Sequence, residues 1–284
     1  MTRISAASGT LWIVATPLGN LDDLSPRARA LLAEVDVIAA EDTRVSKKLL
    51  PPREKPPRWM ALHEHNESRA VGEVVDLLAG GLNVALVSDA GTPLISDPGY
   101  RLVDRAHDAG IRVSPVPGPC AAIAALSASG LASDRFCFEG FLPARAGQRR
   151  KRLEALAYVR ATLMFYVPAR DLYPVLMDAA ATLGANRLAA VGRELTKRFE
   201  TIRRDGLEAL AVWVHGDPDQ QRGEAVVLIE GAGEESLSRN LDPTLLAREL
   251  ASELPPARAA RILARVSGLD RREAFSLVES VRGH

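Results

Sequence analysis

Two acidic residues follow an apolar run in AAEDTR (39–44), which contains Glu41 and Asp42. Open α/β sheets bind their ligands at the carboxyl ends of the strands, so acids placed there are candidates for chemistry. A pair of carboxylates can act as a general base or bind a hydroxyl group. The alternative is structural, with Asp42 as the N-cap of a helix and Arg44 paired to a neighbouring acid.

The segment VSDAGTPLISDPG (87–99) follows the apolar run LNVALV and is rich in Asp, Gly, Pro, Ser and Thr. Asp89 and Asp97 are eight residues apart, a spacing that disfavours the calcium loop of an EF-hand. An Asp at a strand end suits a ligand hydroxyl or amine, and Gly91 lets a ligand approach the backbone. We therefore interpret Asp89 as ligand-facing and Asp97 with Pro98 as the cap of the next helix.

A Gly-containing turn, VATPLGN (14–20), follows the first apolar run of the chain. Such turns allow backbone amides to approach a ligand closely. The turn matches neither GxGxxG nor GxxxxGK[ST], so the sequence shows neither a dinucleotide fingerprint nor a P-loop. A plain β-turn is the alternative.

Charged residues also end a later apolar run, in GRELTKRFETI (192–202). Arg193, Glu194, Thr196 and Lys197 at a strand end, beside a cleft between domains, are catalytic candidates. A surface cluster of ion pairs explains the same spacing.

Two further segments carry weaker signals. ALHEHNE (61–67) spaces His63 and His65 as on a strand, but no third ligand stands at a telling distance, so we predict no metal site. ARAGQRRKRLEAL (144–156) is basic in a chain whose 36 basic and 36 acidic residues cancel. We interpret it as a flexible loop that binds a polyanion, against the alternative of a solvated helix start. Its basic residues are Arg145, Arg149, Arg150, Lys151 and Arg152.

Short apolar runs alternate with helical patterns in the first 120 residues. This order predicts a mostly parallel sheet covered by helices. The expected strands are 10–16, 35–41, 83–89 and 111–117, and the expected helices are 25–35, 66–81 and 98–110. A helix started by Pro and closed by Gly130 is expected over 117–130.

A second series of longer apolar runs follows a boundary that we place at 120/121. Its expected strands are 134–142, 162–167, 187–195 and 225–231, with a helix over 171–184. After a polar linker, three amphipathic helices are expected, the last beginning at Asp270 and Glu273 after a turn at Gly268, a helix-turn-helix-like geometry. We predict an N-terminal α/β domain (1–120), a C-terminal α/β domain (121–235) and a helical tail (242–284).

The composition sets limits on class and location. The 284 residues include only two cysteines, without CxxC spacing, and no run approaches 18 apolar residues. We expect a soluble cytoplasmic protein without a membrane association.

Several of these segments, in this order, resemble one family. VATPLGNLDDLSPRA, AAEDTR, LHEHNE, VSDAGTPLISDPG, VPGPCAAIAALSASGL, DRFCFEGFLP, RELTKRFETI and GEAVVLIEG are similar to the cytidine-2′-O-methyltransferases of small-subunit ribosomal RNA, in the tetrapyrrole methylase superfamily. The resemblance runs from about Leu11 to Gly231. It implies a two-domain α/β fold with parallel and mixed sheets, a small C-terminal helical domain, a homodimer, and S-adenosylmethionine bound between the domains.

The resemblance also implies which residues bind the methyl donor. They are Pro17, Leu18 and Gly19; Ser88, Asp89, Ala90, Gly91 and Thr92; Gly118, Ala121 and Ala122; and Leu195. We assign catalysis to Lys197, which would stabilise the developing alkoxide, with Glu194 or Glu41 as base or orienting acid. RNA contacts are predicted at Arg44 and at the five basic residues of 144–156.

Two segments depart from the family pattern. FYVPARD places Val167 where the family commonly has an acid, and the final helix reads EAFSLV where the family frequently has Leu-Tyr. Two other functions remain alternatives. One is methylation of a small tetrapyrrole-like substrate, which would not need the basic segment or the tail. The other is a non-catalytic RNA-binding assembly factor.

Overall fold

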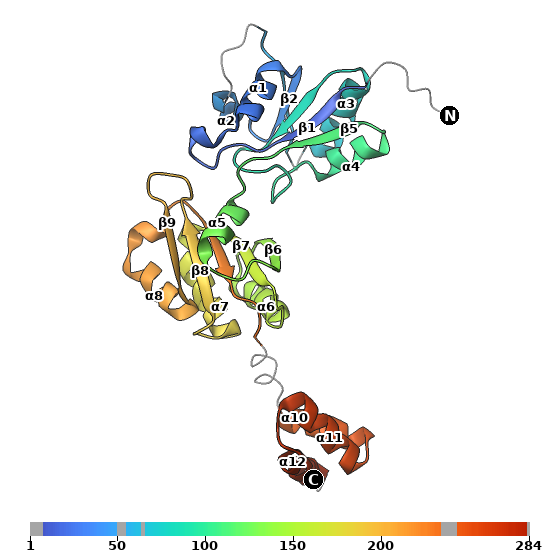
Figure 1. Cartoon of the computed structure of the whole chain (residues 1–284), viewed down its shortest axis with the longest axis vertical. Helices are drawn as coiled ribbons and strands as arrows, with labels where there is room; N and C mark the ends of the chain where they lie inside the picture. Colours follow the sequence, from blue (N-terminus) through green and yellow to red (C-terminus); the bar gives the residue numbers. More distant parts are fainter. Residues whose placement is uncertain (1–7, 50–54, 64–65, 234–242, 283–284) are drawn as a thin grey trace, which may run out of the picture.

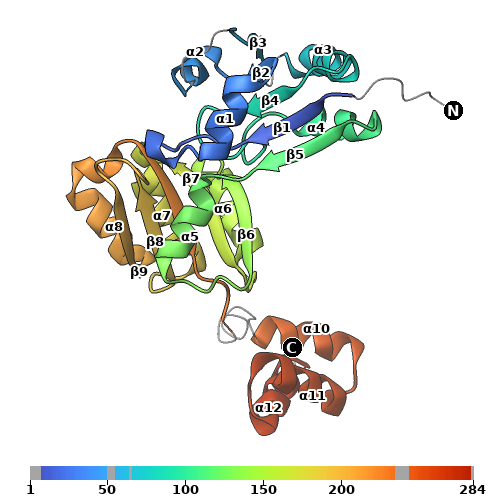
Figure 2. The same ribbon diagram turned by 45° about the horizontal axis from the view of Figure 1, so that its top comes forward.

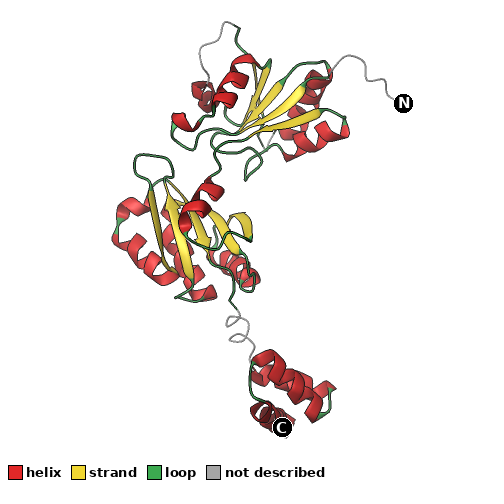
Figure 3. Cartoon of the chain, viewed as in Figure 1, coloured by secondary structure: helices red, strands yellow, loops and turns green. Residues whose placement is uncertain are grey.

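The computed structural model describes residues 8–49, 55–63, 66–233 and 243–282. Figure 1 shows two α/β units followed by a group of three helices, and Figure 3 shows that each α/β unit contains one sheet.

The first sheet is parallel throughout, in the order β3-β2-β4-β1-β5. The residues of β2 and β4 are all buried, which explains why these strands are continuous apolar runs rather than alternating ones. The strands are β1 (Thr10–Val14), β2 (Val37–Ala40), β3 (Arg58–Ala61), β4 (Val84–Val87) and β5 (Arg112–Val116). The helices are α1 (Pro26–Glu34), α2 (Thr43–Ser46), α3 (Glu67–Ala79) and α4 (Tyr100–Asp108), with 3₁₀ turns at Leu21–Asp23 and Lys47–Leu49.

Helices cover both faces of the first sheet. Leu32 of α1 packs with Ile38 on one face. Leu78 of α3 and Leu102 of α4 pack with Leu11 on the other face. The unit is therefore a three-layer sandwich whose functional groups must lie at the ends of its strands.

The second sheet is mixed, in the order β6-β7-β10-β8-β9. β6 and β7 are parallel, whereas β10 runs antiparallel to both of its neighbours, β7 and β8, and β9 is antiparallel to β8. The strands are β6 (Phe136–Phe141), β7 (Thr162–Pro168), β8 (Leu188–Arg193), β9 (Thr201–Gly206) and β10 (Glu224–Ile229). The helices are α5 (Ala121–Ser129), α6 (Ala146–Leu156), α7 (Leu172–Leu183) and α8 (Leu207–Gly216), with 3₁₀ turns at Ala169–Asp171 and Pro218–Gln221.

The two faces of the second sheet are covered unequally. α6, α7 and α8 form a large apolar core with one face. α5 alone packs on the other face, where Ala122 and Ala125 meet Leu195 and Leu228. Figure 2 shows α5 lying along this face, close to the chain that enters from β5. This sparsely covered face is the side on which several of the predicted donor-binding residues lie.

The tail consists of α10 (Pro243–Glu253), α11 (Pro256–Ser267) and α12 (Arg271–Arg282). Gly268 ends α11 with a φ of 76°, a left-handed conformation that favours glycine. The backbone N–H of Glu273 donates to Asp270 Oδ1 over 2.8 Å, and the N–H of Asp270 donates back to Glu273 Oε2 over 3.3 Å. This reciprocal cap confirms the helix start predicted at Asp270.

The predicted fold class, two sheets that are parallel and mixed plus C-terminal helices, is confirmed. Two strands escaped prediction because their sequences carry little signal: β3 (RWMA) is short, and β9 (TIRRDG) is largely charged and exposed. The basic segment predicted to be a loop is the helix α6, which buries Leu153 and Leu156. At Val167, where the sequence departs from the family pattern, the side chain is buried in the core under α7.

Candidate active site

Three loops meet at the carboxyl edge of the first sheet. The N–H of Thr16 donates to Gly91 O over 2.8 Å and the N–H of Gly91 donates back to Thr16 O over 3.0 Å. The hydroxyl of Thr92 donates to Pro119 O over 2.9 Å. These bonds bring together the three predicted donor-binding turns that follow β1, β4 and β5, because neighbouring parallel strands end at the same edge.

Two glycines allow these loops to pack closely. A Cβ on Gly118 would lie 3.0 Å from Ala15 Cβ, and one on Gly91 would lie 3.3 Å from Leu18 Cδ2. Gly91 also has a φ of +86°, which other residues adopt only with strain. At Gly91 and Gly118 the loops approach each other so closely that a larger residue would not fit without a shift of its neighbours. We call the backbone groups of these loops the cradle of the first sheet.

Carboxyl groups gather at the same edge. Asp89 Oδ1 accepts the N–H of Asp42 over 3.1 Å, which connects the loop after β4 to the start of α2. Burial raises the pKa of Asp89. Burial, the Glu41 carboxylate and Asp89 raise the pKa of Asp97 to about 6, and a hydrogen bond with Ser88 only partly offsets this. The edge therefore holds acids whose ionisation the protein disfavours, a property typical of functional sites.

The interpretation of Asp97 as a helix cap is wrong. α4 begins at Tyr100 with Gly99 as its N-cap, and the N–H of Gly99 donates to Glu67 Oε1 from α3 over 3.3 Å. Because the Glu67 carboxylate, and not that of Asp97, accepts the N–H of Gly99, Asp97 does not cap α4. Asp97 lies instead near Ser88 and Glu41. Sequence reasoning missed Asp97 as a site residue because helix caps and site acids share the Asp-Pro-Gly signal.

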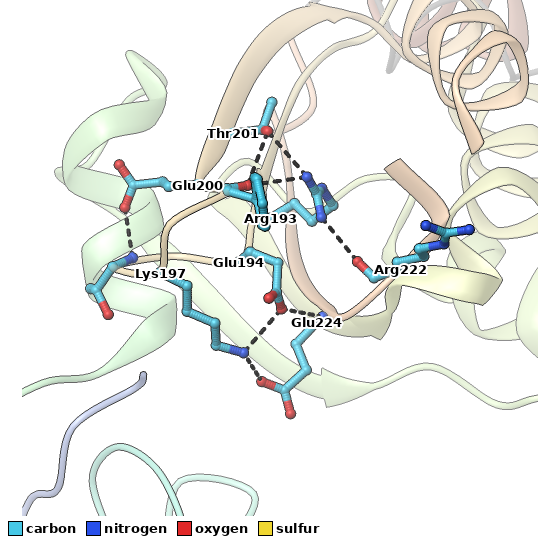
Figure 4. A network of polar contacts seen from close by, with 9 residues as sticks. Arg193, Glu194, Lys197, Glu200, Thr201, Arg222 and Glu224 are labelled. Carbon is cyan, nitrogen blue, oxygen red and sulfur yellow. Dashed lines mark hydrogen bonds and ion pairs between the residues drawn. The ribbon is translucent and has the colours of Figure 1, made fainter. Parts of the chain in front are cut away.

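A charged trio occupies the corresponding edge of the second sheet (Figure 4). Lys197 Nζ donates to Glu194 Oε1 over 3.0 Å and to Glu224 Oε2 over 3.2 Å. Glu194 Oε1 also accepts the N–H of Glu224 over 3.0 Å. Glu224, at the start of β10, is distant in sequence from Lys197, so no spacing pattern could have indicated it.

The backbone of this loop is unusual. Glu194 and Thr196 have φ values of 50° and 65°, the left-handed region that such residues rarely adopt. A Cβ on Gly223 would overlap the Glu194 carboxylate, so the glycine makes room for that group. Strained residues that the surrounding contacts hold in place are common at functional sites.

The contacts within the trio favour the charged forms of Lys197 and Glu194. Burial lowers the pKa of Lys197, but its hydrogen bonds to Glu194 and Glu224 outweigh this, and the pKa is raised. Burial raises the pKa of Glu194, but the hydrogen bonds from Lys197 and the Glu224 N–H outweigh it, and the pKa is lowered. At neutral pH the site thus holds a fixed ammonium group, and Glu194 is a weak base.

The two sheet edges face each other. A Cβ on Gly19, in the loop after β1, would lie 2.5 Å from Lys197 Cγ, so the aliphatic part of Lys197 packs against that loop. On the other side, a Cβ on Gly140 of β6 would lie 3.3 Å from Ser96 Oγ. The structure therefore brings Lys197 and Glu194 together with the Pro17–Gly19 turn, whereas Glu41 lies beside Asp97 at the acidic edge.

The remaining predicted donor-binding residues lie along α5. Ala121, Ala122 and Leu195 belong to the apolar cluster on the face that α5 covers. A Cβ on Gly192 would lie 3.2 Å from Leu195 Cδ2 and 3.4 Å from Ala125 Cβ, so Leu195 packs closely against the second sheet. An apolar wall thus adjoins the polar loops of the first sheet.

The predicted RNA-binding residues divide into two groups. Arg149 is 6% exposed, and its guanidinium pairs with Asp178 over 2.6 Å and donates to Ala144 O over 3.0 Å. Because these partners use the group inside the protein, the assignment of Arg149 to RNA is wrong. The exposed ones are Arg44, paired to Asp42; Arg150, near Asp178; Arg152, paired to Glu139; and Arg145 and Lys151.

Within the described residues, no three His, Cys, Asp or Glu side chains are grouped so as to hold a metal ion. His63 lies just after β3, and His65 lies outside the described residues. None of the helices in the described ranges combines the length and apolar character that a bilayer crossing requires.

The fold and the facing loops define a class of methyltransferase. The model of the tetrapyrrole (corrin/porphyrin) methylases matches residues 10–211. Among solved structures, the methyltransferase CobJ superposes with a TM-score of 0.60 at 23% identity, covering 79% of this chain and 95% of that one. A uroporphyrin-III C-methyltransferase from Thermus thermophilus, complexed with S-adenosyl homocysteine, superposes with a TM-score of 0.54 at 19% identity, covering 78% and 97%.

Curated relatives specify the family further. A ribosomal RNA small subunit methyltransferase I from Pseudomonas aeruginosa is 51% identical over 271 residues, covering 93% of this chain and 94% of the relative. The protein of that name from Escherichia coli O157:H7 is 46% identical over 279 residues, covering 98% and 97%. The chain belongs to the ribosomal RNA small subunit methyltransferase I family of the tetrapyrrole methylases.

Proposed function

We propose that the protein transfers a methyl group from S-adenosylmethionine to the ribose 2′-oxygen of a cytidine in small-subunit ribosomal RNA. The relatives named above support the substrate, since they share about half of their residues with this chain over nearly its whole length. The observation that carries the chemistry is the Lys197 ammonium group, which Glu194 holds in place and whose aliphatic stem packs against the Gly19 turn where two sheet edges meet.

The methyl donor fits the cradle of the first sheet. Gly91 and Gly118 leave no room for side chains, so backbone groups face the ligand, and Asp89 offers a carboxylate to its hydroxyls or amine. S-adenosylmethionine supplies a methyl group that is already activated on a sulfonium. The donor site consists of the residues of the three turns, from Pro17 to Gly19, Ser88 to Thr92 and Gly118, with Ala121, Ala122 and Leu195 as the apolar wall.

The catalytic roles follow from charge. The 2′-hydroxyl is a weak acid, so a cation that stabilises the developing alkoxide lowers the barrier. Lys197 supplies that cation, and Glu194 orients it, since the lowered pKa of Glu194 makes it a poor proton acceptor. Glu41, at the facing edge, accepts the proton. The orientation of the methyl donor and the ribose 2′-oxygen relative to each other contributes the rest of the rate enhancement.

The RNA contacts are electrostatic. Arg44, Arg145, Arg150, Lys151 and Arg152 are exposed and can neutralise phosphates. Since the chain has no net charge, the substrate is recognised within an assembled or nearly assembled subunit rather than as naked RNA. We further propose a cytoplasmic homodimer with α/β domains at 1–120 and 121–235 and a helical domain at 242–284.

One experiment separates this function from its alternatives. The protein is incubated with labelled S-adenosylmethionine and either purified small ribosomal subunits or a porphyrinoid, and the RNA is digested and mapped by mass. We expect one methylated cytidine ribose and no labelled porphyrinoid. A labelled porphyrinoid would indicate a small tetrapyrrole substrate, as its name indicates for the uroporphyrin-III C-methyltransferase. Failure to bind the donor in calorimetry would indicate a non-catalytic assembly factor.

A further inference from the structure

The edge strand β6 ends in an exposed aromatic ring. Phe141, its last residue, is 59% exposed, and its ring centroid lies 5.6 Å from that of Tyr166 in an edge-to-face arrangement. Phe138 contacts the same tyrosine at 4.9 Å. A shift in register between Phe138 and Phe141 brings both rings onto Tyr166, whereas strict alternation would not. Phe141 is therefore held in a defined orientation although it faces solvent.

Tyr166 connects this ring to the donor site. Burial raises the pKa of Tyr166, and the nearby Cys120 and Asp97 add to this effect, while the N–H of Ala122 donates to the tyrosine hydroxyl. Ala122 lies in the first turn of α5 on the apolar wall, and Asp97 belongs to the acidic edge. The tyrosine thus lies between the methyl-donor site and Phe141.

The strand itself also approaches the site. Gly140, the neighbour of Phe141, lies against Ser96, and the next residue after Ser96 is Asp97. β6 and β7 are parallel, so Phe141 and Tyr166 lie at the same end of the second sheet as the end of β8, from which the Lys197 loop departs. The exposed ring consequently lies at the end of the second sheet that faces the loops of the proposed active site.

We propose that Phe141, supported edge-on by Tyr166, is the platform on which the base of the target nucleotide stacks. This inference depends on the proposed function. A nucleotide that leaves the surrounding stack can bring its 2′-oxygen to a donor held between the two sheet edges, and proteins receive splayed-out bases on aromatic faces. Stacking does not distinguish one base from another, so Phe141 positions the nucleotide, and other groups select cytidine.

The strand offers a matched control. Phe136, at the opposite end of β6, is 46% exposed and pairs in register with Thr162, remote from the loops of the site. The test compares Phe141→Ala, Phe141→Leu, Phe141→Trp and Phe136→Ala. Methylation of purified small subunits is measured as kcat/KM, the donor Kd is measured by calorimetry, and the Tm verifies folding.

Loss of a stacking contact lowers kcat/KM by about 5- to 150-fold in Phe141→Ala, and by a similar factor in Phe141→Leu, which keeps a branched apolar side chain but not the π-face. The donor Kd stays unchanged, Phe141→Trp retains activity, and Phe136→Ala behaves as the wild type. Full activity of Phe141→Ala or Phe141→Leu, or an equal loss in Phe136→Ala, would contradict the role of Phe141 as a platform. Neither result would contradict the proposed methyltransferase function. A wild-type protein that methylates no RNA contradicts the proposed function and the platform with it.

Discussion

The two sheet edges that meet at the proposed active site treat charge in opposite ways. At the edge of the first sheet, neither Asp89 nor Asp97 has an ion pair within the described residues, and the pKa of each is raised. At the edge of the second sheet, Lys197 is held between two glutamates. The pKa of Lys197 is raised and that of Glu194 is lowered, so both side chains stay charged.

The difference indicates a division of tasks. Acids that carry a desolvation penalty without a cation are retained where a ligand supplies the missing partner. A cation that its neighbours already hold in place does not have to reorient when negative charge develops beside it, so no free energy is spent on reorganisation during the reaction. We therefore expect the first edge to respond to substitution through donor binding and stability, and the second through turnover and through its network of pairs.

The largest effect is expected at the cation. Lys197→Met removes the charge while preserving most of the aliphatic stem that packs on Gly19. Turnover should fall by about 10²- to 10³-fold, the usual cost of losing such a group, while the donor Kd stays nearly constant. Single-turnover assays with labelled donor measure this, with Arg198→Met as the neighbouring control. Normal turnover in Lys197→Met would refute the assignment.

Ion pairs of the second unit that lie away from the proposed site should contribute to stability and not to turnover. Arg149→Ala leaves the Asp178 carboxylate without its closest partner in a buried position. Breaking such a pair costs about 3–5 kcal/mol, so the free energy of unfolding in urea should fall by that amount. Lys151→Ala, on the exposed side of α6, should leave the free energy of unfolding unchanged and weaken only RNA binding. Equal stabilities for the two variants would be inconsistent with this division.

Asp89 sharpens the comparison from the acidic side. Asp89→Asn keeps an oxygen for the Asp42 N–H but removes the charge offered to the donor. A hydrogen bond to a charged group contributes about 1.5–3 kcal/mol, so the donor Kd should rise by about 10- to 150-fold. Calorimetric titration measures this, and Asp108→Asn on exposed α4 is the control. An unchanged Kd would remove Asp89 from the donor site.

The smallest effect concerns stability and pH. Because the pKa of Asp97 is raised to about 6, the folded protein binds that proton more tightly than the unfolded chain does. Its contribution to stability is therefore present below about pH 4 and decreases as the pH rises through 6. Asp97→Asn should raise the Tm at pH 7 by about 2–4 °C and leave it unchanged near pH 4. If the Tm of Asp97→Asn equals that of the wild type at both pH values, the ionised Asp97 carboxylate does not destabilise the folded protein.

The sequence predicted the loops of the site better than it predicted their partners. Strand-end motifs such as VATPLGN and VSDAGTPLISDPG are local, and their Gly, Pro and Asp residues act through backbone geometry within a few positions. Glu224 and Glu67 act across long sequence separations, so no local spacing reveals them. The same limit explains Arg149, whose partner Asp178 lies on a different helix.

What the sequence alone determined is therefore the alternation of buried strands and helices, the order of the loops that follow them, and the resemblance that connects those loops to a methyl donor. The tertiary structure decided which charges those loops face. It placed Asp97 beside Ser88 and Glu41 instead of at a helix start, buried Arg149 against Asp178, and packed Phe141 against Tyr166. The physical reason is that backbone preferences act between neighbours in the chain, whereas burial and charge pairing act between neighbours in space.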